Sequence, residues 1–143
     1  ALSKKAWGDH AMARACYEAA LEVDPDIIIM VLAATAMEDV VRDLGCNWCG
    51  EIVADRAYND DGTLVDRSLP GAVIHDASLA GPRILQMVQE GAIITQSGKR
   101  IETSIDTICL HGDTAEAVAL AQSVRNSLKA GGVGLQQFAG RTG

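Results

Sequence analysis

Apolar residues along the chain fall partly at helical spacing and partly in short unbroken runs, which is the pattern of βα units around a parallel sheet. Helical spacing predicts helices over about 3–21 with Ser3 as the N-cap, over 37–44 ending at Gly45, over 82–90, and over 117–128. Runs without polar alternation predict buried strands over 27–32, 49–54 and 105–110. The dipeptide Ser97-Gly98 predicts a two-residue hairpin turn between 93–95 and 100–103, and 133–136 is expected to add a short last strand. The expected fold class is α/β.

Composition and charge limit the classes of protein to which this chain can belong. The 143 residues are 48% hydrophobic and 22% charged, which is typical of a single globular domain, here expected over 1–143. A net charge of -7 repels a phosphate backbone, so we expect no nucleic-acid partner. The longest apolar run, 27–34, is too short for a membrane helix, and no basic and then apolar leader opens the chain. We therefore expect a soluble, cytoplasmic protein that contacts no membrane.

Two motifs that often carry chemistry have simpler explanations here. Cys46 and Cys49 form a Cys-x-x-Cys, but no second pair completes a zinc site, and a redox pair would precede a helix. We expect reduced, structural thiols and predict no metal site. The glycine-rich run 131–134 lacks the strand before it and the helix after it that a dinucleotide loop requires, so it is expected to end a helix.

A long polar stretch, 55–70, directly follows the strand predicted over 49–54. Ligands of α/β folds bind beyond the carboxyl ends of strands, so this position favours a site. Arg56 at its start and Arg67 near its end are suited to forming a positive fork for a carboxylate or phosphate. The alternative, which the spacing favours, is that Asp55 and Arg56 pair with neighbours to hold the loop.

A second polar segment follows the strand predicted over 105–110. His111 is a titratable ring at a strand end, where core packing does not explain it, and functional and structural interpretations both remain open. Asp113, three residues before Glu116, is close to a capping box at the start of the last helix. Capping and catalysis do not exclude each other at this position.

Two long motifs carry a resemblance to a known family. Residues 54–68, ADRAYNDDGTLVDRS, with 71–74, GAVI, closely resemble the LamB/YcsF family of 5-oxoprolinase subunits, and 106–113, DTICLHGD, matches a second signature of that family. The resemblance spans nearly the whole chain. It implies one component of the ATP-dependent enzyme that hydrolyses the lactam of 5-oxoproline to glutamate together with two further subunits, with ATP used by the full complex. The fold it implies is an irregular β/α barrel similar to carbohydrate deacetylases.

The sequence also departs from the family pattern. The early signatures, an acidic Asp-Leu-Asn-type opening and several His-bearing loops, are absent from the 143 residues. We therefore expect the C-terminal portion of the barrel, inactive alone, with metal dependence left open. An open barrel exposes a strand edge and apolar faces, so we expect association with the other half or a homo-oligomer.

The resemblance and the chemistry of a lactam together predict roles. A 5-oxoproline pocket needs a positive group for the carboxylate and a donor or acid for the lactam carbonyl. The predicted catalytic residues are His111 and Asp113. The predicted substrate-binding residues are Asp55, Arg56, Tyr58, Asp61 and Arg67. Of these, Tyr58 and Asp61 are expected at the rim of the cleft. The alternative is a non-catalytic, doubly wound α/β module that binds a small anion in the same loops.

Overall fold

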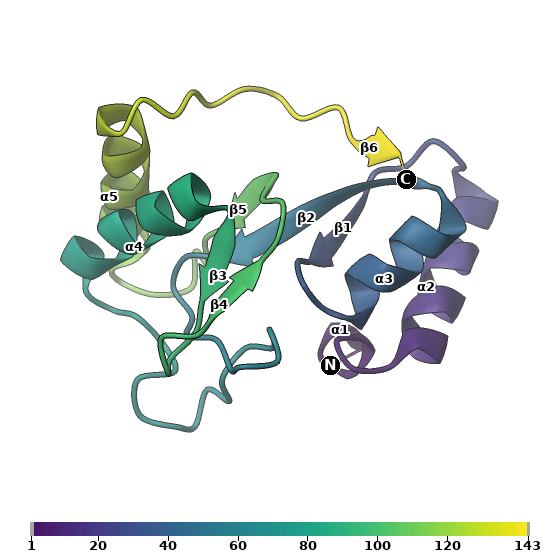
Figure 1. The fold of residues 1–143 in the computed structure, drawn as a ribbon, viewed down its shortest axis with the longest axis horizontal. Helices are drawn as coiled ribbons and strands as arrows, with labels where there is room; N and C mark the ends of the chain where they lie inside the picture. Colours follow the sequence, from purple (N-terminus) through teal and green to yellow (C-terminus); the bar gives the residue numbers. More distant parts are fainter. Residues whose placement is uncertain (1, 143) are drawn as a thin grey trace.

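A parallel β-sheet lies at the centre of the structure, a computed structural model that describes residues 2–142 (Figure 1). Its strands are β1 (Ile29–Leu32), β2 (Asn47–Val53) and β5 (Thr107–Cys109), in the order β1-β2-β5. A short strand, β6 (Arg141–Thr142), pairs antiparallel with the start of β2. The prediction of an α/β fold with a parallel sheet is therefore confirmed.

The helices lie in two groups at opposite ends of the sheet. Figure 1 shows α1, α2 and α3 together on one side and α4 and α5 together on the other. Their bounds are α1 (Leu2–Ala6), α2 (His10–Val23), α3 (Ala36–Leu44), α4 (Ala77–Glu90) and α5 (Ala117–Ala130). Trp48 and Ile52 of β2 and Ile84 and Met87 of α4 are fully buried in the core between them. Within residues 2–142, no helix has both the length and the apolar character needed to cross a membrane.

The first predicted helix is two helices. α1 ends at Ala6, the chain turns at Gly8, and α2 begins after Asp9. The Asp9 carboxylate accepts a hydrogen bond from the N–H of Met12 at 2.9 Å, as an N-cap does. Ser3 lies inside α1, so its prediction as the N-cap was wrong. The single predicted helix is interrupted because Gly8 weakens it at a point where Asp9 can start a new helix.

Helix α4 begins at Ala77, five residues before the predicted start at Pro82. Asp76 caps it by accepting the N–H of Ser78 at 2.8 Å. A proline in the second turn removes one backbone donor, but Ala80 and Ile84 on either side of it are fully buried. The packing of this turn outweighs the preference of proline for a helix start.

The strand predictions hold for the buried runs and fail near the C-terminus. Residues 133–136 form no strand, and β6 lies further along the chain. The predicted hairpin is present as β3 (Ala92–Ile94) and β4 (Arg100–Glu102). Its turn has three residues instead of two, because the N–H of Thr95 bonds Lys99 O at 2.9 Å and Gly98 takes a φ of +88°.

The polar stretch after β2 is an ordered loop at the carboxyl end of the sheet. Two isolated bridges, Arg56 with Val73 and Tyr58 with Leu64, bring its two sides together. A small apolar cluster of its own, Ala57, Val65 and Ala72, is buried beneath it. The loop therefore has its own packing and holds its side chains in place above β2.

Candidate functional site

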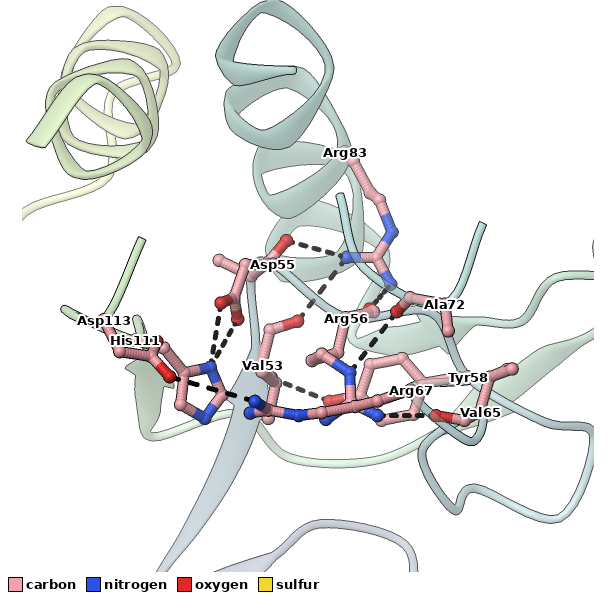
Figure 2. A network of polar contacts seen from close by, with 11 residues as sticks. Val53, Asp55, Arg56, Tyr58, Val65, Arg67, Ala72, Arg83, His111 and Asp113 are labelled. Atoms are coloured by element: carbon pink, nitrogen blue, oxygen red, sulfur yellow. Dashed lines mark hydrogen bonds and ion pairs between the residues drawn. The ribbon is translucent and has the colours of Figure 1, made fainter. Parts of the chain in front are cut away.

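Asp55 and His111 lie side by side where two neighbouring strands end (Figure 2). Val53 of β2 is paired with Cys109 of β5 in a parallel register, and each polar residue follows two positions later. The His111 Nδ1 atom lies 2.8 Å from both Asp55 carboxylate oxygens. The Asp55 side chain is 5% exposed and that of His111 is 30% exposed. The pair is thus anchored on its carboxylate side and open on its ring side.

The carboxylate of Asp55 determines what the imidazole ring can do. A carboxylate at Nδ1 favours the tautomer with the proton on that nitrogen, which leaves Nε2 free to accept a proton. The same arrangement orients the ring and stabilises it when it becomes charged. Asp55 was predicted to bind substrate, and in the structure its buried carboxylate contacts the His111 ring.

Arg56 is buried and holds the loop. Its Nη2 donates to Val65 O at 2.5 Å and its Nε donates to Ala72 O at 3.3 Å. Burial, and then the charge of Arg67, lowers the pKa of Arg56 below its ordinary value. Backbone carbonyls therefore engage two nitrogens of the Arg56 guanidinium, which is the loop-holding alternative, and the fork with Arg67 stays a prediction.

Tyr58 is also part of the loop's support. It is fully buried, and its hydroxyl oxygen accepts the N–H of Val53 at 2.7 Å. Burial raises the pKa of Tyr58 to about 12, so the hydroxyl stays protonated. The prediction that Tyr58 shapes the rim of a cleft was wrong, because the side chain packs beneath the loop.

Asp61 stabilises a turn within the loop. Its carboxylate accepts hydrogen bonds from Thr63 Oγ1 at 2.6 Å and from the Thr63 N–H at 2.9 Å, and these lower the pKa of Asp61. It lines an open hollow of about 870 Å³ together with Ala34 and Glu38, beyond the end of β1. Asp61 therefore stabilises a turn and lines this hollow, whose lining does not include Asp55 or His111, and its place at the rim of a substrate cleft stays a prediction.

Arg67 and Asp113 reach the same end of the sheet as His111. Arg67 Nη1 lies 3.8 Å from Asp113 Oδ2, and both side chains are more than half exposed. Figure 2 shows this pair beside the His111 ring. An exposed ion pair at this distance is weak, so the guanidinium remains available to an anionic ligand. Asp113 does not cap α5, whose N-cap is Glu116 without a side-chain hydrogen bond.

Two side chains that the sequence analysis did not single out belong to this region. Arg83 of α4 donates to Arg56 O at 2.9 Å and to Ala54 O at 3.2 Å, which covers the carboxyl end of β2. Burial lowers the pKa of Arg83, and no local sequence pattern distinguishes it from a surface arginine. The other is Glu51, a carboxylate within the apolar run of β2, and that contrast was a usable signal.

The described residues offer little to a metal or to a nucleotide. No three of their His, Cys, Asp and Glu side chains come together as metal ligands. Cys46 and Cys49 are free, and burial raises the pKa of both thiols, which is opposite to the activation of a redox pair. Gly131 ends α5 and Gly134 lies in irregular chain, so this run opens no helix for ATP phosphates. We therefore derive no step through a metal or through ATP in this chain.

Comparison with known proteins gives the family of the chain and agrees with its α/β fold. The family model described as "LamB/YcsF family" matches residues 1–143. The chain is 70% identical over 130 residues to a protein of Ruegeria pomeroyi that is named as a 5-oxoprolinase subunit, and the match covers 91% of this chain and 51% of that protein. It is 43% identical over 138 residues to the protein of the same name from Nitrobacter hamburgensis, covering 96% and 54%.

A solved structure agrees with these sequences. The crystal structure of the lactam utilization protein from Thermus thermophilus superposes with a TM-score of 0.82 at 35% identity. The match covers 96% of this chain and 54% of that one. The chain belongs to the LamB/YcsF family, and it spans about half the length of the curated relatives it matches.

Proposed function

We propose that the intact protein is one component of an ATP-dependent enzyme that hydrolyses the lactam of 5-oxoproline to glutamate, together with two other subunits. The relatives' names support the substrate. The observation that carries the chemistry is the Asp55–His111 pair, with Nδ1 held at 2.8 Å and Nε2 left to act. ATP is assigned to the full complex, because this chain has no phosphate-binding turn at its glycine-rich run.

The reaction consumes one water molecule. The water oxygen bonds to the lactam carbonyl carbon while His111 Nε2 takes one of its protons. The ring C–N bond then breaks, its electron pair stays on nitrogen, and the proton held by His111 passes to that nitrogen. The products are the new carboxyl group and the amine of glutamate, the carboxyl proton passes to the amine to give a carboxylate and an ammonium group, and His111 returns to its starting state.

The test is glutamate release from 5-oxoproline by the intact protein with its partner subunits, with and without ATP, and by the 143-residue piece alone. We expect glutamate release by the intact protein with its partner subunits and ATP, and none by the 143-residue piece. The reason is that His111 and Asp113 are the only two catalytic residues predicted in this piece, and the whole reaction needs more groups than these. Glutamate release by the purified piece would contradict this division of labour. Binding of 5-oxoproline without turnover by the complete set would favour a non-catalytic anion-binding module instead.

Arg67 is the proposed partner of the substrate carboxylate. We expect Arg67→Lys in the intact enzyme to raise KM by about tenfold while kcat changes by less than about threefold, because a point charge cannot replace a bidentate contact. Arg125→Lys on the exposed face of α5 is the matched control and should leave both constants unchanged. Equal loss of kcat and kcat/KM in Arg67→Lys would instead place this residue in the chemical step.

A further inference from the structure

Glu51 projects from the face of the sheet that leads to the Asp55–His111 pair. In the parallel register, Glu51 of β2 lies between Leu32 of β1 and Thr107 of β5, so these three side chains share one face. The next row on that face is Val53 and Cys109, directly before the strand ends. Glu51 therefore lies one row further into the sheet than the strand ends that carry the pair.

The surroundings of Glu51 leave its carboxyl group open to a ligand. The side chain is partly buried, and in the part of the chain that the structure describes its carboxylate has no hydrogen bond and no ion pair. Leu32, which lies opposite Glu51 in β1, is buried, whereas Met30, two residues earlier on the same face, is 55% exposed, so Glu51 lies next to the row where this face becomes exposed. A carboxyl group held in an apolar strand without a protein partner is costly as an anion and useful as a donor.

The electrostatics of the cluster agree with this position. Burial raises the pKa of Glu51, and a positive charge on His111 opposes that shift. Burial, and then the charges of Glu51 and Asp55, raises the pKa of Cys109 to about 11. The titratable groups that face Glu51 from the elements around it are Cys49, Asp55, Tyr58, Cys109 and His111. The neighbours of Glu51 therefore include one base, His111, and the buried carboxylate of Asp55, which already contacts His111.

The site as described lacks a donor for the lactam carbonyl oxygen. Arg67 provides a positive group and His111 provides a base, while Arg56 and Tyr58 are engaged with backbone groups. We propose that Glu51, in its protonated form, donates a hydrogen bond to the lactam carbonyl oxygen, an assignment that rests on the proposed function. Thr107, the partner of Glu51 in β5, and His111 are at most roughly 13 Å apart along the chain, and the proposal places the lactam between the Glu51 and His111 side chains on this face. Protonated carboxyl groups stabilise an oxyanion in this way.

The test compares Glu51→Gln and Glu51→Ala in the intact enzyme with its partner subunits. Loss of the donor in Glu51→Ala should lower kcat by about 10²–10³-fold. Glu51→Gln keeps an N–H donor and should stay within about tenfold of wild type. Glu51 donates only when protonated, so wild-type kcat should fall as pH rises through its raised pKa, and this alkaline limb should vanish in Glu51→Gln, whose amide donates at every pH. Glu22→Gln, on the exposed face of α2, is the matched control.

Other outcomes overturn the proposal. Equal loss in Glu51→Gln and Glu51→Ala means that the residue acts as an anion, and unchanged kcat in both with a lower Tm means that its role is structural. Infrared difference spectroscopy adds a readout that does not depend on turnover. At a pH above the ordinary pKa of glutamate, wild type should still show the band of a protonated carboxyl group, and Glu51→Gln should lack it. If the enzyme turns over 5-oxoproline but shows no such band, the role of Glu51 as a donor is contradicted and the proposed function is not. A band in an enzyme that does not turn over 5-oxoproline contradicts the proposed function instead.

Discussion

Replacing His111 by alanine in the intact enzyme should lower kcat by about 10²–10⁴-fold while KM changes by less than about threefold. The reason is that Nε2 is expected to act only as the chemical step proceeds, whereas substrate binding depends on other groups. Steady-state kinetics with 5-oxoproline and ATP measures both constants. His75→Ala is the matched control, since this exposed ring approaches only Glu116, at 3.8 Å, and its loss should change neither constant. A rise in KM without loss of kcat in His111→Ala would make His111 a binding residue.

Replacing Arg56 by methionine should destabilise the loop over 55–74. The buried guanidinium donates to Val65 O and Ala72 O, and methionine leaves both carbonyls with one donor fewer. Ala72 O keeps the N–H of Ala57 at 3.0 Å, so Val65 O is the carbonyl that loses its donor among the described residues. A buried polar group without its partner costs about 1–3 kcal/mol, and we expect a loss of local stability of that size. The Met side chain keeps most of the apolar stem, which limits the effect to the lost hydrogen bonds.

Limited proteolysis of the intact protein measures this local stability, because cleavage within the loop reports how often it opens. Cleavage between residues 57 and 72 should become much faster in Arg56→Met. Arg125→Met, at an exposed position of α5, should change local stability by no more than an ordinary surface substitution does, about 0.5 kcal/mol, so the cleavage rate should change little. Unchanged cleavage in Arg56→Met would mean that the two carbonyls do not depend on this guanidinium and that Arg56 is free for another role.

The placement of Asp55 and His111 at one edge of the sheet was predictable because it follows from topology. Asp55 and His111 each directly follow an apolar run, and the carboxyl ends of neighbouring parallel strands meet at one edge of the sheet. Sequence order alone therefore brought the two residues together. Their direct contact was not predictable, since which loop residue turns inward depends on packing that the local pattern does not contain.

The errors in the site come mainly from burial. Arg56 and Tyr58 are polar residues in a polar stretch, and only the ordered loop shows that both side chains point into it. Arg83 reaches the end of β2 from a helix about 30 residues away, and no spacing rule connects the two. Glu51 differs, since a charge within the buried run of β2 was visible and went unused.

The errors in the fold come from competing local signals. Gly45 ends α3 with a φ of +63°, as its position predicted, because glycine favours that conformation and little else competes there. Pro82 and Ser3 were each a plausible helix start, but Asp76 and Asp9 cap the helices instead. Strand β6 is two residues long and pairs with β2, which lies far earlier in the sequence, so no local pattern marks it.

The measurement that tests the account most directly is a double-mutant cycle on kcat, with Asp55→Asn, His111→Ala and the double variant in the intact enzyme. The Asp55–His111 contact means that Asp55 acts through the ring, so removing it should matter only while His111 is present. We expect Asp55→Asn to lower kcat by about 10²–10⁴-fold and the double variant to be no slower than His111→Ala alone. Losses that multiply in the double variant would contradict the account, because they would mean that Asp55 and His111 act independently.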